Sequence, residues 1–163
     1  MNQEIERKFL VRGDGWRPGA HGVLCRQGYL SSAIGCTVRV RLMGDAALLT
    51  IKGATKGITK LEYEYPIPTA DAQALLDRLC VKPLIEKRRF TVPFAGMTWE
   101  IDEFLGENQG LLVAEVELEA EDQPVELPAW AGAEVSGDPR YFNVNLVRHP
   151  YAHWGTNQAP HPT

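Results

Sequence analysis

The sequence predicts a mainly β (α+β) fold: a closed, eight-stranded antiparallel β-barrel that forms a tunnel, with helices packed outside. Three observations lead to this prediction. Eight short segments alternate between apolar and polar residues with a period of two, the spacing of a β-strand. Turns rich in glycine, proline and aspartate separate them, and one segment has clear helical spacing. The charged faces also segregate by sign, whereas a face built for solubility mixes both signs.

The first strand, residues 4–11, shows the pattern most clearly. Glu4, Glu6 and Lys8 share one face, and Ile5 and Phe9 share the other. Two carboxylates about 6–7 Å apart on one strand face can clamp a hard divalent cation. A solvated sheet face would explain this strand alone, so the inference depends on the strands that follow.

The next four strands repeat the alternation. They are predicted over residues 23–32, 37–42, 48–52 and 60–65. Their polar faces carry a tyrosine, cations and then acids: Tyr29, Arg39, Arg41, Lys52, Glu62 and Glu64. Pro66 and Pro68 end the last of them.

A helix is predicted over Thr69–Cys80. Thr69 is its expected N-cap and Asp71 lies in its first turn. Its apolar stripe comprises Ala72, Leu75, Leu76 and Leu79. A helix with one apolar stripe must pack that stripe against another element, and the apolar strand faces provide the surface.

Three further strands are predicted over residues 84–92, 98–104 and 112–119. Their polar faces hold Lys87, Arg89, Glu100, Asp102, Glu115, Glu117 and Glu119. The chain beyond residue 120 changes character. We expect a short helix over Val125–Ala133 and a second helix from Pro139 to Val147, with Asp138 as N-cap and proline at the first helical position. The tail, residues 158–163, looks frayed.

Length and composition are those of an ordinary globular protein. The chain has 163 residues, with 44% hydrophobic and 23% charged residues, so we expect a single domain: a barrel over about 1–120 and a helical segment over about 124–150. A net charge of −4 does not favour nucleic-acid or anionic-membrane binding. We expect no membrane partner and no signal peptide. Three cysteines without metal-ligand spacing indicate free thiols in a reducing cytoplasm.

The charged strand faces are expected to point into the barrel. If the apolar faces pack outward against the helices, the ionic faces must line the interior. So many unpaired ions cannot form a dry core, because their desolvation would cost far more than the stability of a domain. A water-filled tunnel that holds a ligand satisfies both conditions. The alternative is an open sheet with one face in water.

Cations facing carboxylates suit a chain of phosphates bridged to the acids by a divalent metal. Arginine grips phosphate oxygens with two donors, and lysine adds a point charge. The candidate phosphate-binding residues are Lys8, Arg39, Arg41, Lys52, Lys87 and Arg89.

With these residues in place, the chain resembles the CYTH superfamily, the triphosphate tunnel metalloenzymes, over most of its length. The residues that carry the resemblance are Glu4-x-Glu6-x-Lys8, Arg39-x-Arg41, Lys52, Glu62-x-Glu64, Lys87-x-Arg89, Asp102 and Glu115-x-Glu117. It implies an eight-stranded barrel that binds triphosphate with Mg²⁺ or Mn²⁺, and the chain is most similar to the short inorganic tripolyphosphatases. The implied substrate is a small-molecule triphosphate; the resemblance leaves the oligomeric state open.

Site roles follow from the resemblance. It implies that Glu4, Glu6 and Glu117 bind a first metal. A second metal or the attacking water would be held by Glu62, Glu64, Asp102 and Glu115. The six cations would hold the phosphates and stabilise the charge that develops as the terminal phosphate leaves.

Lys8 and Tyr29 are the candidate catalytic pair. An ammonium beside Tyr29 would lower the pKa of the phenol and allow it to accept a proton from water. The alternative is a tunnel-lining tyrosine that hydrogen-bonds to phosphate.

Two other functions remain open. An adenylyl cyclase of the same superfamily would need a pocket for adenine and ribose, and no sequence feature identifies one. A non-catalytic polyphosphate- or nucleotide-binding module would need fewer carboxylates facing an anion. The four histidines and four tryptophans are expected to be surface residues and packing anchors, respectively.

Overall fold

The computed structural model describes residues 2–155. Its strands are β1 (Gln3–Val11), β2 (Gly22–Ala33), β3 (Cys36–Met43), β4 (Ala46–Gly53), β5 (Thr59–Pro66), β6 (Ile85–Phe94), β7 (Met97–Phe104), β8 (Leu112–Glu117) and β9 (Ala131–Glu134). The helices are α1 (Thr69–Arg78) and α2 (Asn143–Arg148), with 3₁₀ turns η1 (Gly106–Asn108), η2 (Pro139–Tyr141) and η3 (Tyr151–His153).

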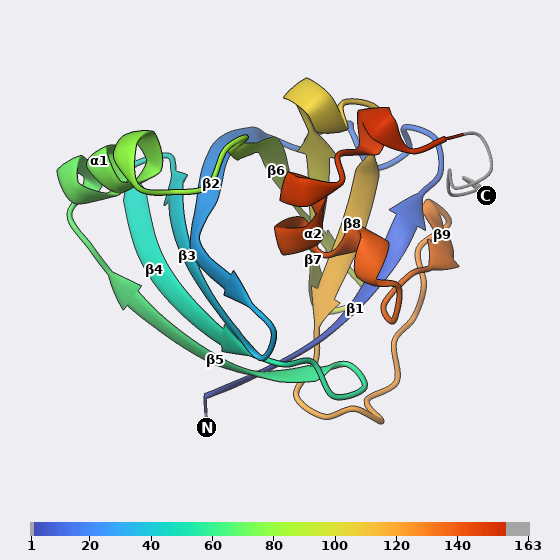
Figure 1. Cartoon of the computed structure of the whole chain (residues 1–163). Coiled ribbons are helices and arrows are strands. Elements are labelled where there is room, and N and C mark those ends of the chain that lie inside the picture. The colour runs from blue at the N-terminus through green and yellow to red at the C-terminus, as the bar shows by residue number, and fades with distance from the viewer. Residues whose placement is uncertain (1, 156–163) are drawn as a thin grey trace.

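The nine strands form one antiparallel sheet in the order β5-β4-β3-β2-β6-β7-β8-β1-β9. An additional pairing of β1 with β5 closes the first eight strands into a ring. That closure is short, because only Gln3, Glu4 and Ile5 pair with β5. Figure 1 shows the curved sheet, with α1 on one side and the C-terminal turns on the other. The predicted ring of eight antiparallel strands is confirmed.

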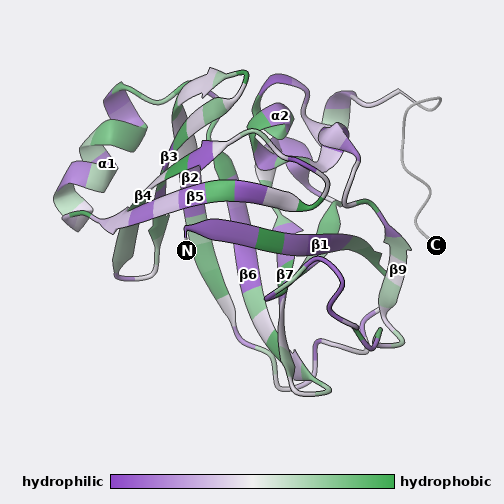
Figure 2. Ribbon diagram, turned by 90° about the horizontal axis from the view of Figure 1, so that it is seen from below, coloured by the Kyte–Doolittle hydropathy of each residue, from purple (hydrophilic) through white to green (hydrophobic). Residues whose placement is uncertain are grey.

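The hydrophobic core forms three clusters between the sheet and the segments that cover it, and the second lies on the inner face of the ring, since it includes Tyr29. The first packs Phe9, Trp99 and Ile101 against the chain around Trp130. The second packs Ile85 and Phe104 against the C-terminal turns, and the third packs Val40 and Ala47 against α1. Figure 2 shows hydrophilic and hydrophobic residues alternating along β1 and β5, which leaves the polar face of each strand for the interior.

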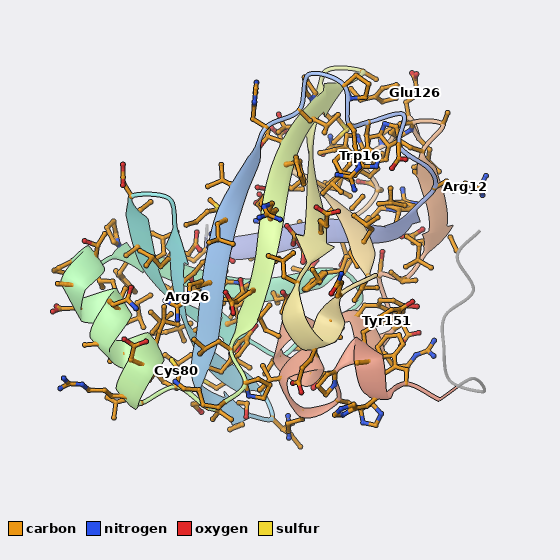
Figure 3. The ribbon with its side chains drawn as sticks, turned by 90° about the horizontal axis from the view of Figure 1, so that it is seen from above. Arg12, Trp16, Arg26, Cys80, Glu126 and Tyr151 are labelled. Carbon is orange, nitrogen blue, oxygen red and sulfur yellow. The ribbon has the colours of Figure 1, made fainter. Side chains whose placement is uncertain are left out.

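Tryptophans anchor this packing, as predicted. Trp99 is fully buried and stacks edge-on with Trp130, with ring centroids 5.3 Å apart. Trp16, labelled in Figure 3, packs edge-on against Phe90 of β6. The cysteines are free thiols, also as predicted: Cys25 and Cys80 are buried and Cys36 is exposed.

Helix α1 is shorter than predicted and has a different cap. It ends at Arg78, and Pro68 in an extended conformation occupies the N-cap position, so Thr69 is its first helical residue. No side chain caps the helix. Ala72 and Leu76 are fully buried against β3 and β4, whereas Leu79 is 65% exposed. The predicted apolar stripe is therefore only half covered.

One glycine permits the close approach of β2 to the segment after α1. A Cβ atom at Gly28 would lie 2.7 Å from both Cys80 Cβ and Leu84 Cδ2. Figure 3 shows Cys80 between α1 and β2. Only a hydrogen atom fits at position 28, so the close packing of the β2 backbone against Cys80 and Leu84 requires glycine here.

The C-terminal segment differs most from expectation. The helix predicted over Val125–Ala133 is wrong: the chain is irregular there, and Ala131–Glu134 form β9, which pairs with β1. The helix predicted over 139–147 is split, because Phe142 adopts an extended conformation (φ −72°, ψ 129°) between η2 and α2. Asp138 does cap η2, accepting a hydrogen bond from the Arg140 backbone N–H. The predicted frayed tail lies outside the described residues.

None of the helices within residues 2–155 combines the length and apolarity needed to cross a membrane.

Candidate active site inside the ring

The ring encloses a cavity of about 520 Å³ lined mainly by charged side chains. All but one of the sequence-predicted site residues line it: Glu4, Glu6, Lys8, Tyr29, Arg39, Arg41, Lys52, Glu62, Glu64, Lys87, Arg89, Glu115 and Glu117. The exception is Asp102. Strand register explains the convergence, because neighbouring strands place acids and bases opposite each other, such as Lys8 opposite Glu115 and Lys52 opposite Glu62.

Strands β1 and β8 contribute the acid-rich wall. Glu6 lies opposite Glu117 in the register, and the Lys8 Nζ atom is 3.8 Å from carboxylate oxygens of both Glu6 and Glu115. Burial, followed by the negative charge of Glu115, raises the pKa of Glu6 to about 8. Burial also disfavours the charged form of Glu115, but Lys8 and Arg89 outweigh it and hold the Glu115 pKa well below its ordinary value.

Lys8 itself stays charged. Burial lowers its pKa, but the charges of Glu115, Glu6, Glu4 and then Tyr29 outweigh burial, so that its pKa is raised. Strand β2, which carries Tyr29, is not a neighbour of β1 in the ring. Tyr29 therefore acts on Lys8 across the interior rather than from an adjacent strand. It lies opposite Arg39 in the β2–β3 register and is 5% exposed.

Lys52 connects β4 to the two acids on either side of the ring closure. Its Nζ atom is 2.8 Å from Glu4 Oε1 and 3.3 Å from Glu62 Oε2. Burial and the charge of Glu4 raise the pKa of Glu62 to about 7. Lys52 is thus shared by two acids, of which Glu62 is disfavoured in its charged form.

Arg39 and Arg41 share one carboxylate. Their Nη2 atoms lie 3.6 and 3.9 Å from Glu64 Oε2, and Arg39 also donates a hydrogen bond to Thr50 Oγ1 at 3.3 Å. The Arg39 Nε atom is buried and has no hydrogen-bond partner within the described residues. A buried donor left unsatisfied is costly, and an anionic ligand in the cavity would satisfy it.

Asp102 is placed differently from the other predicted metal ligands. It is fully buried, does not line the cavity, and accepts hydrogen bonds from Arg89 Nε and Nη2 at 2.8 and 2.9 Å and from Lys87 Nζ at 2.8 Å. Burial alone would raise the pKa of Asp102, but Arg89 and Lys87 lower it. Its carboxylate is occupied by two of the phosphate-binding candidates, which it holds in place.

The C-terminal segment closes one side of the cavity, although the sequence prediction assigned none of its residues to the site. Asn143 Oδ1 accepts hydrogen bonds from Lys87 Nζ at 3.0 Å and from Gln27 Nε2 at 3.1 Å. Phe142 and Arg148 also line the cavity. Asn143 and Arg148 are the first and last residues of α2 and Phe142 directly precedes it, so strand alternation carries no signal for their place in the site.

Lys60 and Glu100 line the cavity as well and were not predicted as site residues. The signal for both was present, since strand alternation places Lys60 on the face of Glu62 and Glu100 on the face of Asp102. Glu100 Oε2 lies 3.3 Å from Arg89 Nη1.

The acids are distributed around the cavity rather than gathered at one point. Within residues 2–155, no group of three Asp, Glu, His or Cys side chains is close enough to form a metal site on its own. The chemistry of the donors nevertheless fits a divalent cation. Burial comes first among the causes that raise the pKa of Glu6, Glu62 and Glu117, and neighbouring carboxylates add to it. Buried carboxylates that cannot all ionise are stabilised by a hard cation with oxygen preference.

Comparison with known proteins gives a consistent result. Residues 2–151 match the family model described as the CYTH domain. The chain is 53% identical over 151 residues to an inorganic triphosphatase of Acetivibrio thermocellus, covering 93% of this chain and 97% of the relative. It is 36% identical over 150 residues to an inorganic triphosphatase of Nitrosomonas europaea, covering 88% and 96%.

Solved structures share the fold. The inorganic triphosphatase NE1496 matches with a TM-score of 0.63 and 35% identity, covering 88% of this chain and 93% of that chain. A putative adenylyl cyclase from Hippeastrum, HpAC1, described as having a dominant triphosphatase activity, matches with a TM-score of 0.59 at 15% identity, covering 72% and 80%. At that identity the second likeness concerns the fold alone.

Proposed function

The chain belongs to the CYTH family, and we propose that it is an inorganic triphosphatase that hydrolyses the terminal phosphoanhydride bond of tripolyphosphate or a similar linear triphosphate, with a divalent metal. The observation that carries this proposal is the convergence, among the described residues, of eight cations and seven carboxylates on one cavity. Relatives named inorganic triphosphatase, at 53% and 36% identity, support the same reaction.

The cations of the cavity would bind and orient the phosphate chain. Arg39, Arg41 and Arg89 would grip phosphate oxygens, and the unpartnered Arg39 Nε atom would gain the acceptor it lacks. Lys8, Lys52 and Lys87 would add positive charge where negative charge develops as the terminal P–O bond breaks and pyrophosphate leaves.

The carboxylates would hold the metal, which would neutralise and polarise the phosphate oxygens. We assign the first ion to Glu4, Glu6 and Glu117, and a second ion or the attacking water to Glu62, Glu64 and Glu115. Asp102 is better suited to fixing Lys87 and Arg89, since both its oxygens accept hydrogen bonds from them. Mg²⁺ and Mn²⁺ both suit oxygen ligands.

Tyr29 would accept the proton of the attacking water, with Lys8 across the cavity stabilising the phenolate. Tyr29 lines the same cavity as the carboxylates, so both the attacking water and the phosphate can reach its hydroxyl group. Three free thiols suit a reducing compartment, which supports the proposal that the reaction takes place in the cytoplasm.

A phosphate-release assay tests the proposal. Tripolyphosphate, ATP, thiamine triphosphate and pyrophosphate are each incubated with the protein and Mg²⁺, Mn²⁺ or a chelator. We expect release from tripolyphosphate that requires metal, and little from pyrophosphate. Formation of cyclic AMP from ATP would instead identify a cyclase, and saturable binding of tripolyphosphate without phosphate release would identify a binding module.

A further inference from the structure

Lys60 differs from the other cations that the ring strands contribute to the cavity. Each of Lys8, Arg39, Arg41, Lys52, Lys87 and Arg89 has a carboxylate oxygen within 4.0 Å. Among the residues described, none brings a carboxylate oxygen within that distance of Lys60. Its charge is therefore not engaged by an ion pair.

The contact that Lys60 does make is with an aromatic ring. Its Nζ atom lies 5.2 Å from the centroid of Phe142, and the Lys8 Nζ atom lies 5.6 Å from the same centroid. A cation over an aromatic face is attracted by about 0.5–2 kcal/mol. The aromatic ring of Phe142 thus contacts two ammonium groups, Lys60 from β5 and Lys8 from β1, at the same end of the cavity.

Phe142 is well placed to do this because the backbone around it is fixed. Its extended conformation separates η2 from α2. On either side, Tyr141 and Leu146 are buried, and Asn143 accepts hydrogen bonds from Gln27 and Lys87. The aromatic ring of Phe142 is therefore carried by a backbone that cannot shift without breaking contacts on both sides.

We propose that Lys60 is a further phosphate-binding residue of this site, and that Phe142 positions it beside Lys8. The inference rests on the proposed function. Lys60 is partly buried and has no carboxylate oxygen of the described residues within ion-pair distance, so a phosphate chain that enters the cavity would supply its counter-ion. Lys60 then binds the end of the chain nearest Phe142, next to the group held by Lys8.

Binding of inorganic tripolyphosphate in the presence of EDTA, measured by titration calorimetry, tests Lys60 without turnover. The variant is Lys60→Met, and the matched control is Lys56→Met, which removes the same charge from an exposed position outside the cavity lining four residues earlier. We expect Lys60→Met to bind about tenfold more weakly than the control, the value of one charged hydrogen bond. Lys60→Arg should keep most of the affinity. Equal affinities of Lys60→Met and Lys56→Met would overturn the proposal.

Kinetics with metal present separate binding from chemistry. We expect Lys60→Met to raise KM for tripolyphosphate about tenfold and to change kcat less than about threefold. A wild-type protein that releases no phosphate would refute the proposed function, while the comparison in EDTA would still decide the role of Lys60. An active wild type with equal binding by both variants would refute the role of Lys60 alone.

A double-mutant cycle tests the positioning by Phe142. Phe142→Leu should weaken tripolyphosphate binding, and Phe142→Leu combined with Lys60→Met should lose less than the sum of the two single losses. Phe142→Met provides the same test if the leucine variant does not fold, as judged by circular dichroism. If the two losses of binding free energy simply add, the Phe142 side chain does not act through Lys60.

Discussion

Glu6 lies opposite Glu117 and within 3.8 Å of Lys8, and burial followed by the charge of Glu115 raises its pKa to about 8. At the scale of single residues, Glu6 is therefore a carboxyl group whose charged form is disfavoured by burial and by its acidic neighbours. A bound cation would stabilise that charged form.

Replacing Glu6 by Gln should reduce metal-dependent phosphate release by about 100-fold or more, because a metal ligand is lost at the reacting phosphate. Initial rates over a range of Mg²⁺ or Mn²⁺ concentrations measure the effect. Glu126→Gln, an exposed acid outside the cavity, serves as the control. Activity of Glu6→Gln equal to that of the control would remove Glu6 from the metal site.

Tyr29→Phe should lower kcat by about 100-fold, since a general base contributes about 10²–10⁴ in rate. The dependence of kcat on pH should also change. A variant with the wild-type rate and pH profile would leave Tyr29 as a phosphate ligand or a wall residue.

Asp102→Asn removes a charge without changing size and leaves Lys87 and Arg89 without their buried counter-ion. Breaking a buried ion pair on one side costs about 3–5 kcal/mol. We expect the free energy of unfolding in urea to fall by that amount, together with weaker tripolyphosphate binding. Full stability of the variant would mean that Glu115 and Glu100 compensate Arg89 on their own.

At the scale of elements, strand alternation predicted eight strands and most of the charged residues that line the cavity, because burial on one face leaves a period of two in the sequence. The same reasoning failed beyond residue 120. Residues 131–134 become β9 through pairing with β1, and Phe142 interrupts the expected helix through contacts with Lys8 and Lys60. Both outcomes depend on distant partners that local spacing cannot reveal.

The close contact of β2 with the segment after α1 also belongs to this scale. Gly28→Ala should destabilise the protein by about 1–3 kcal/mol, because the new methyl group would overlap Cys80 and Leu84. Chemical denaturation measures the change. Gly137→Ala, where a Cβ atom meets nothing within 4 Å, should have little effect. If the two variants have similar free energies of unfolding, β2 and the segment after α1 can move apart without loss of stability.

For the molecule as a whole, the buried acids set how stability depends on pH in the absence of metal. The pKa values of Glu6 and Glu62 are raised from 4.5 to about 8 and about 7, so the folded state holds protons that the unfolded state releases. Their stabilising contribution is complete below pH 4.5 and is lost as pH rises through these values.

In EDTA, the melting temperature should therefore fall between about pH 5 and 8, and Glu6→Gln should flatten the decline. Differential scanning fluorimetry at constant ionic strength measures both curves. A wild-type curve that rises over this interval, or one that the substitution leaves unchanged, would contradict the assignment of Glu6 as a buried acid with a raised pKa.

The closure of the ring by three residues of β1 bears on how the chain folds during synthesis. Strand β1 is synthesised before the other strands of the ring and pairs with β5, β8 and β9, so its last neighbour emerges only when residue 134 has been translated. Until then a hydrophobic strand edge stays open to other nascent chains. Truncated or stalled products that end before β8 should consequently aggregate or depend on chaperones, whereas released full-length chains should not.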